Sequence, residues 1–408
     1  MKAFVFTDAA LEEQAGRFVW LEIDTEKAKN AAFRKKYPVR ALPTYLVVEP
    51  DREQVLLKWV GGATVPQLQR LLTDVRGDFD RARKGALAGS GAKPAAGAPG
   101  AKGVPGADDL LAQADLLYGE GKGPEAAEVY QKAIAAAPSD WPRYGRAVEA
   151  LLVDWSMEEN CSSALPFARD VYPRLAKTTS VAVIAGVGLD CAAALPDSDS
   201  TKAASFEFFE RAASQAVADQ SIPMADDDRS GLYISLLEAH KAARDSSGAR
   251  AVATSWASFL EGAAAKAPTP DARAVFDPHR LSAYLELGQP EKAVPMLQQS
   301  EADLPDDYNP PYRLAVAYKA MQRWDDALAA CDRAIAHGYG PRLLNILRTR
   351  ADILVAKGDT AAARATLEDA VKKSEALPEG QRSQGTTDAL RKKLEGLAPA
   401  PPPAATGP

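Results

Sequence analysis

The 408-residue chain has few of the residues that build metal centres and disulfide frameworks. It contains three cysteines, no two of them at CxxC spacing, and three scattered histidines, so no zinc site or other metal site is predicted. Cys161 and Cys191 flank one expected helical hairpin. We expect two buried free thiols there, and a bridge formed in an oxidising compartment is the alternative. Cys331 is expected to be a small core residue.

Long apolar runs and an excess of positive charge are also missing. No run reaches the roughly 18 apolar residues of a membrane-spanning helix, so none is predicted. The net charge of -6 argues against a nucleic-acid partner. The residues after Met1 lack the apolar core of a secretion signal, so the sequence as given predicts a cytoplasmic protein and does not settle the compartment. A signal segment upstream of Met1 would place it in the periplasm instead.

Two short motifs invite a catalytic or ligand-binding interpretation and do not support one. Asp226-Asp227-Asp228 lacks the spaced oxygen ligands of a calcium loop, and we expect it to cap a helix that begins near Arg229. Gly186-Val187-Gly188 has no strand before it and no lysine after it, as a phosphate loop requires. No cofactor and no catalytic residue are predicted.

An internal repeat is the main feature of residues 108–397, where the pattern is helical throughout. A small residue recurs at Ala293, Ala327 and Ala363, 34 and then 36 residues apart. Four further positions keep the same register in the three units: Leu281, Ala315 and Ala351; Tyr284, Tyr318 and Leu354; Leu297, Cys331 and Leu367; Ser300, Ala334 and Ala370. A similar unit at the front of the region uses Ala114, Leu117, Ala126, Tyr130, Ala133 and Pro138.

This pattern of small residues, aromatics and a final proline resembles the tetratricopeptide repeat, clearly over about 140 residues and weakly between Trp141 and Asp271. The resemblance implies an α-solenoid that binds a protein or peptide partner in a groove lined by the first helix of each hairpin. It implies the groove residues Asn309, Tyr312, Val316, Lys319, Asn345, Arg348 and Asp352, with Arg313 and Arg350 close by. The lysine and asparagine set with which some members hold a peptide carboxyl terminus is not found.

Residues 1–80 mix strand and helix patterns and are expected to form a small α/β domain. We predict a strand over 17–24, a helix over 25–36 with Thr25 as its N-cap, an antiparallel hairpin over 44–48 and 54–60, and a helix over 64–75. Residues 81–107, rich in Gly, Ala and Pro, are predicted to be a flexible linker, and residues 398–408 a disordered tail.

The segment Tyr37–Val47 resembles the cis-proline segment of thioredoxin-like domains. The resemblance implies that Pro43 is the cis-proline and that Leu42, Pro43 and Thr44 contact an incoming peptide. A trans proline that opens a strand is the alternative.

The chain departs from the thioredoxin family at its start, because the CxxC and the strand before it would lie upstream of Met1. Either the sheet pairs differently, or, as we prefer, the natural start lies further upstream. The predicted function is a protein-interaction scaffold whose thioredoxin-like domain is redox-inactive as the sequence stands. The alternative is a thiol–disulfide oxidoreductase whose CxxC precedes Met1.

Overall fold

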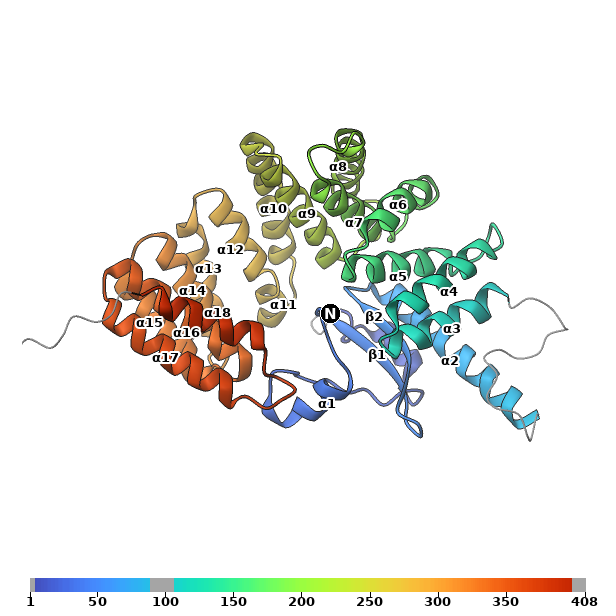
Figure 1. Cartoon of the computed structure of the whole chain (residues 1–408), viewed down its shortest axis with the longest axis horizontal. Coiled ribbons are helices and arrows are strands. Elements are labelled where there is room, and N and C mark those ends of the chain that lie inside the picture. Colours follow the sequence, from blue (N-terminus) through green and yellow to red (C-terminus); the bar gives the residue numbers. More distant parts are fainter. Residues whose placement is uncertain (1–3, 89–105, 398–408) are drawn as a thin grey trace, which may run out of the picture. The chain divides into compact units, whose positions relative to one another are not determined.

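The computed structural model describes residues 4–88 and 106–397, and this part of the chain is mainly helical (Figure 1). It contains the α-helices α1–α18 and one two-stranded sheet. The described residues divide into two compact units. The first unit takes residues 1–18 and 41–252, and the second takes residues 19–40 and 253–408. These units do not follow the predicted boundary between residues 1–80 and the repeats.

A β-hairpin followed by a long helix opens the main part of the first unit. β1 (Thr44–Glu49) pairs antiparallel with β2 (Gln54–Val60), as predicted, with a register shift between Val47 and Val48. α2 (Val65–Ala88) begins where a helix was predicted but continues to Ala88, into the residues expected to form the linker. Residues 89–105 and 398–408, where the rest of the linker and the tail were predicted, lie outside the described residues.

A small apolar core joins α2 to the hairpin and to the 3-10 helix η1 (Ala9–Gln14). Leu57 of β2 packs with Leu71 and Val75 of α2. The other buried members of this core are Val5, Leu11, Ala63, Leu68 and Leu72. The sheet has an apolar partner on α2, as the alternating pattern of its strands requires.

The predicted strand over residues 17–24 is wrong, and the predicted helix over 25–36 is confirmed only for its later part, from Ala28 on. Residues 19–24 form no strand, and the side chains of Val19 and Leu21 are 88% and 75% exposed. A β-strand needs a neighbouring strand for its backbone hydrogen bonds. The β propensity of residues 17–24 predicted a strand but could not show that such a neighbour is present. Asp24 instead holds a turn by accepting the backbone N–H of Glu26 (2.9 Å), so the helical part starts later, with η2 (Ala28–Asn30) and α1 (Ala31–Lys36).

The helices that follow form a series of packed neighbours along the chain. In the first unit they are α3 (Ala107–Gly119), α4 (Gly123–Ala135), α5 (Tyr144–Met157), α6 (Cys161–Leu175), α7 (Val181–Ala194), α8 (Lys202–Ala218) and α9 (Asp226–Ala242). The chain passes into the second unit within α10 (Ser246–Ala265). α9 begins at Asp226, so the three aspartates do lie at a helix start.

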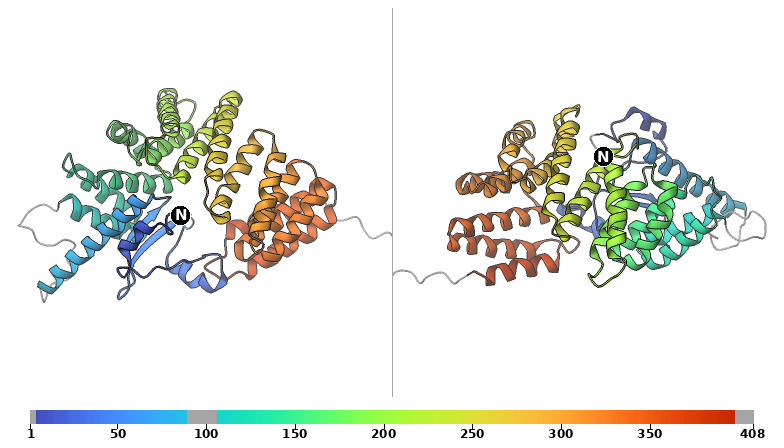
Figure 2. Two further views of the ribbon diagram at one scale, coloured as in Figure 1. Left: turned by 180° about the vertical axis from the view of Figure 1, so that it is seen from behind. Right: turned by 90° about the horizontal axis from the view of Figure 1, so that it is seen from above.

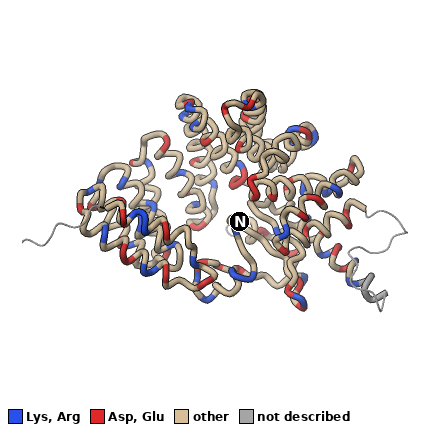
Figure 3. The backbone as a smooth tube through the Cα atoms, in the orientation of Figure 1, with Lys and Arg blue, Asp and Glu red and all other residues tan. Residues whose placement is uncertain are grey.

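The second unit continues with helices that lie side by side in the views of Figure 2. They are α11 (Pro270–Ala274), α12 (Asp277–Glu286), η3 (Pro290–Lys292), α13 (Ala293–Asp303), α14 (Asn309–Ala320), α15 (Trp324–His337), α16 (Gly340–Lys357), α17 (Thr360–Ala376) and α18 (Gln384–Glu395). Acidic and basic residues are interspersed along α15–α18 (Figure 3). Some of them pair across helices, as Arg333 of α15 does with Glu301 of α13 (2.7 Å).

The predicted repeat register is confirmed by burial. All fifteen side chains at the five repeated positions are buried in the second unit. Eleven of them have no measurable exposure, and these include the three anchor alanines, Ala293, Ala327 and Ala363. A small side chain at the anchor lets the two helices of a hairpin approach closely, which is why this position tolerates so little volume.

The N-terminal segment Val19–Arg40 belongs to the second unit and contacts its last helices. Tyr339, just before α16, donates its hydroxyl to Asp24 Oδ2 (2.6 Å). Gln381, between α17 and α18, donates to the backbone oxygen of Thr25 (3.0 Å). Residues from the start of the chain are thus fixed on turns near its end.

Three local features hold the helices of the first unit together. Cys161 and Cys191 form a disulfide between α6 and α7, with their Cα atoms 5.2 Å apart, so the expectation of two free thiols is wrong and the alternative holds. That Cα–Cα distance lies within the range that a disulfide bridge requires. The second feature is Gly188, inside α7, where a Cβ would overlap the ring of Phe209 of α8. A glycine at this position therefore lets the two helices pack closely.

Arg229 of α9 forms the third feature, since it holds the carboxyl end of α8. The residue is only 3% exposed. Its guanidinium donates to four backbone oxygens, those of Ala216 (2.8 Å), Val217 (2.8 Å), Asp219 (3.3 Å) and Ile222 (3.1 Å). A cation at this place also complements the negative end of the α8 dipole.

Candidate protein-binding surfaces

α14 and α16 are the first helices of two successive hairpins, and they contact each other in the second unit. Two side-chain contacts join them. Tyr312 Oη lies 3.3 Å from Thr349 Oγ1, and Lys319 Nζ lies 3.9 Å from Asp352 Oδ2. Asp352 is also paired with Lys393 of α18. Three of the predicted groove residues are therefore engaged within the protein, where they align the helices.

The other predicted groove residues differ in their surroundings. Asn309 closes the start of α14, because its backbone N–H and its side chain both donate to Asp307 Oδ1 (2.8 and 2.7 Å). Burial lowers the pKa of Arg313. Asn345 and Arg348 are exposed on α16, and no hydrogen bond or ion pair within the described residues occupies their side chains. These two remain available for a ligand.

Residues 308–376, which include α14–α17, match the family model of the tetratricopeptide repeat. These residues are similar to tetratricopeptide repeats. The matched residues contain two of the three units found from the repeat register. They also contain all seven predicted groove residues, from Asn309 to Asp352. The family model thus covers the whole predicted groove.

Several solved structures of tetratricopeptide repeat proteins are weakly similar to this chain. A tetratricopeptide repeat protein from Parabacteroides merdae has a TM-score of 0.45 at 12% identity and covers 71% of this chain and 97% of its own. The TPR2AB domain of yeast Sti1 in complex with pHSP90 has a TM-score of 0.27 at 17% identity and covers 71% of this chain and 98% of its own. TTC0263, a TPR protein of Thermus thermophilus, has a TM-score of 0.28 at 17% identity and covers 61% and 99%. No curated protein matches the chain in sequence.

The predicted peptide-contacting loop lies in the first unit. The Leu42–Pro43 peptide bond is cis, as the sequence resemblance implied. Leu42 is 62% exposed, Thr44 donates its hydroxyl to the oxygen of Ala41 (2.6 Å), and Pro43 accepts the N–H of Gly61 (3.0 Å). The structure therefore presents one apolar side chain, Leu42, beside the first residue of β1.

The β-hairpin packs on the first repeat pair, which the sequence did not predict. Val55 of β2 lies against Gly119 at the end of α3, where a Cβ would be 2.8 Å from the valine side chain. Lys58 Nζ stands 5.0 Å from the centre of the Tyr118 ring. Arg143, the residue just before α5, binds Asp78 of α2 (3.1 Å). The hairpin, α2 and the first helices are one packed unit.

A set of buried ionisable groups lies deeper in the same unit. Asp115 of α3 accepts from Tyr130 (2.8 Å) and is paired with Arg146 of α5. Glu149, one turn further along α5, is buried, and burial raises its pKa to about 7 although Ser180 donates to it. A carboxyl group in this surrounding loses hydration that one hydroxyl does not replace.

Asp228 connects α9 to the turn between β2 and α2. The backbone N–H of Gly62 donates to its carboxylate, and a Cβ at Gly62 would lie 2.8 Å from Oδ1. Burial and the neighbouring Asp227 raise the pKa of Asp228 to about 6. Trp59 donates its indole N–H to the oxygen of the same Gly62 (3.0 Å), so an aromatic reporter adjoins this contact.

Raised folded-state pKa values make the first unit less stable at higher pH. Glu149 and Asp228 bind protons more tightly in the folded than in the unfolded chain. Their protonated forms therefore contribute fully to the free energy of unfolding below about pH 4, and this contribution is lost as the pH rises through their folded-state pKa values of about 6 and 7. Each group contributes a slope of up to about 1.4 kcal/mol per pH unit. We expect Asp228→Asn and Glu149→Gln to raise the free energy of unfolding at pH 8 relative to the unsubstituted protein, with little change at pH 4.

Hydrogen exchange at the two pH values measures this effect. Asp170, an exposed carboxylate of α6, provides the control, since Asp170→Asn is expected to change stability little at either pH. A pH dependence that stays the same in Asp228→Asn and Glu149→Gln would show that these carboxylates are not responsible.

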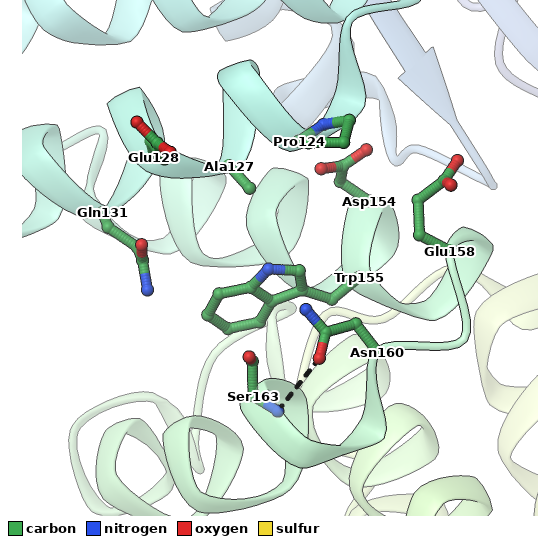
Figure 4. Close-up of a pocket in the computed structure, with 9 residues that line it drawn as sticks. All are labelled: Pro124, Ala127, Glu128, Gln131, Asp154, Trp155, Glu158, Asn160 and Ser163. Atoms are coloured by element: carbon green, nitrogen blue, oxygen red, sulfur yellow. Dashed lines mark hydrogen bonds between the residues drawn. The ribbon is translucent and has the colours of Figure 1, made fainter.

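A pocket of about 250 Å³ opens between α4, α5 and the start of α6 (Figure 4). Trp155 of α5 lies across its centre in the close-up. The lining residues are Pro124, Ala127, Glu128, Gln131, Asp154, Trp155, Glu158, Asn160 and Ser163. Three of the nine are carboxylates and none is a lysine or arginine. The pocket is therefore acidic and has an aromatic floor.

Sequence reasoning missed this pocket. Asp154 and Glu158 are four residues apart and share a helix face, which is the available signal. In the sequence, Trp155 has the pattern of an ordinary core residue. Glu128 belongs to another helix, so its spacing from Asp154 gives no signal either. Within the described residues, no three His, Cys, Asp or Glu side chains are grouped to hold a metal ion. None of the helices in residues 4–88 and 106–397 combines the length and apolarity needed to cross a bilayer.

Proposed function

We propose that the protein is an interaction scaffold that binds a protein or peptide partner through the first helices of its tetratricopeptide repeats. The family match over residues 308–376 supports this, because repeats of this type present an extended surface built from successive helices. Within that surface, Asn345 and Arg348 of α16 are the exposed polar side chains without an internal partner in the described part of the groove. They carry the proposed contact.

We further propose that residues 1–80 include a thioredoxin-like domain, which contacts peptides through Leu42, Pro43 and Thr44. The order of a proline-preceded strand, a second antiparallel strand and a helix supports this. No cysteine precedes Cys161, so the chain as given has no dithiol in this domain. Thiol–disulfide exchange by a dithiol upstream of Met1 remains the alternative function.

Substitution of the two exposed groove residues tests the scaffold. The doubly substituted protein, Asn345→Ala with Arg348→Ala, is expected to lose partner binding by tenfold or more, since a few polar and arginine contacts dominate an interface (about 1.4 kcal/mol is tenfold). Quantitative mass spectrometry of proteins captured from native cells measures the loss. Lys372→Ala, which removes an exposed charge from α17, is the matched control and should capture the same proteins as the unsubstituted chain.

Two results would contradict the proposal. If no protein is enriched over an unrelated bait, the chain is not a scaffold under these conditions. If partners are enriched equally by the unsubstituted and doubly substituted proteins, the contact does not use α16.

A further inference from the structure

We propose that the Cys161–Cys191 disulfide is a redox-sensitive clasp on the first half of α6 (residues 161–167). While the bridge is closed, this half stays helical and covers Trp155. When a dithiol reduces the bridge, the half unfolds and Trp155 becomes exposed. The clasp lies in the first unit and goes beyond the binding proposed for the groove of the second unit.

The bridge fastens α6 at its first residue. Cys161 begins α6, and Cys191 lies in α7 with only 3% exposure, so that the two Cα atoms are 5.2 Å apart. Most residues of α7 are buried, which makes it a core helix of the unit. A closed bridge therefore ties the start of α6 to a fixed point and restricts the positions that an unfolded first half could reach.

The backbone of α6 is weak near the end of its first half. Pro166 and Pro173 both lie inside the helix. Pro166 has no N–H to donate to the carbonyl oxygen of Ser162, one turn before it, and proline destabilises a helix interior more than any other residue. The few residues before Pro166 are also too short a segment to stay helical without packing. The first half therefore depends on its attachment to neighbouring helices.

The second half of α6 (residues 168–175) has attachments of its own. Val171 is 2% exposed. Arg174 donates to the backbone oxygen of Ser139 (2.6 Å), and its guanidinium carbon lies 3.4 Å from the centre of the Tyr144 ring. These contacts do not involve the bridge, so we expect the second half to stay folded when the bridge is reduced.

The first half of α6 covers Trp155 of α5. The ring of Phe167 lies against the indole, with 5.5 Å between the centroids and 90° between the planes, and Trp155 is 6% exposed. Asn160 and Ser163, at the start of α6, line the same pocket as Trp155 (Figure 4). Unfolding of the first half takes these three residues away from the indole. Reduction would thus change the surface that the first unit presents around the pocket.

Reduction requires a dithiol from outside the chain. Cys161 is half-buried and Cys191 is buried, so we expect the first thiolate of the reductant to attack Sγ of Cys161. The electron pair of the broken S–S bond passes to Sγ of Cys191, which takes a proton. The second thiol of the reductant then displaces Cys161 from the mixed disulfide. The protein gains two thiols, and the reductant leaves as a disulfide.

Amide hydrogen exchange of the full-length protein with and without dithiothreitol tests the clasp. Dithiothreitol should reduce the bridge in the folded protein, and peptides covering residues 161–167 should then exchange at least about tenfold faster, with a much smaller change in α7. The double variant Cys161→Ser with Cys191→Ser should show the same fast exchange without reductant. Acrylamide should quench Trp155 more strongly after reduction, measured as the difference between the protein and its Trp155→Phe variant.

Two proline substitutions distinguish a local clasp from a general loss of stability. Pro166 and Pro173 are both exposed, so alanine should be tolerated at either position. Pro166→Ala restores the missing N–H and should slow the exchange of the first half in the reduced protein by about tenfold or more. Pro173→Ala makes the same change in the second half. It is the matched control and should leave the exchange of the first half unchanged.

Three results would overturn the proposal. The first is a bridge that dithiothreitol reduces only in denaturant. The second is exchange of residues 161–167 that reduction leaves unchanged, or that rises equally throughout the first unit. The third is an equal effect of Pro166→Ala and Pro173→Ala on the first half. None of these measurements involves Asn345 or Arg348, so the groove in the second unit is tested separately.

Discussion

Replacing Arg229 by methionine should lower the stability of the first unit by about 3–5 kcal/mol. Four backbone oxygens, two in the last turn of α8 and two just after it, would lose their shared donor in a place that is almost closed to water. Each acceptor left without a partner costs about 1–3 kcal/mol, less where water can enter. The loss should be seen as faster amide exchange in α8 and α9 before other helices of the unit are affected.

Two further substitutions make this test specific. Arg229→Lys keeps the charge but lacks the planar fork of five donors, so an intermediate loss is expected. Arg211→Met removes an exposed arginine of α8 that pairs with Glu207 one turn away (3.2 Å), and its effect should stay within about 0.5 kcal/mol. If Arg229→Met exchanged no faster than Arg211→Met, the capping of α8 by Arg229 would contribute nothing to stability.

Removing the disulfide is expected to have an effect of similar size. Cys161 and Cys191 are 30 residues apart, and closing a loop of this length restricts the unfolded chain by about 3–4 kcal/mol. Tris(carboxyethyl)phosphine should therefore lower the melting temperature of the protein. The double variant Cys161→Ser with Cys191→Ser should melt at the lower temperature with or without the reductant.

A thiol count provides the control for the disulfide. Cys331 is buried, and burial raises the pKa of its thiol to about 12, so it should react with thiol reagents only after unfolding. The denatured, unreduced protein should then show one thiol, and the reduced protein three. Three thiols without reduction, together with a melting temperature insensitive to the reductant, would contradict the bridge.

The repeats could be predicted from the sequence because each depends on local spacing that recurs. Ala327 and Ala363 mark the same close approach in two hairpins, and a pattern repeated at fixed intervals is informative even when each residue is common. The hairpin of β1 and β2 was equally accessible, since its turn and alternation lie within 17 residues, from Thr44 to Val60.

The errors concern features that depend on partners distant in the sequence. Val19–Asp24 has the composition of a strand, but no neighbouring strand pairs with it in the described structure. The sequence also did not show that Tyr312 and Lys319, predicted to line the groove, contact Thr349 and Asp352 on the next first helix. The pocket around Trp155 needs side chains of three helices at once, a coincidence that periodicity along one helix does not reveal.

The placement of Val19–Arg40 on the last helices has a consequence for synthesis. Asp24 meets Tyr339 and Thr25 meets Gln381, contacts that span 315 and 356 residues. At about 5–20 residues per second, a ribosome needs roughly 20–70 s to make the intervening chain. During that time Val19 and Leu21 have left the ribosome while the helices that anchor their segment do not yet exist. The first residues of the second unit to be made are thus among the last to be fixed, and an early-acting chaperone would find this segment accessible.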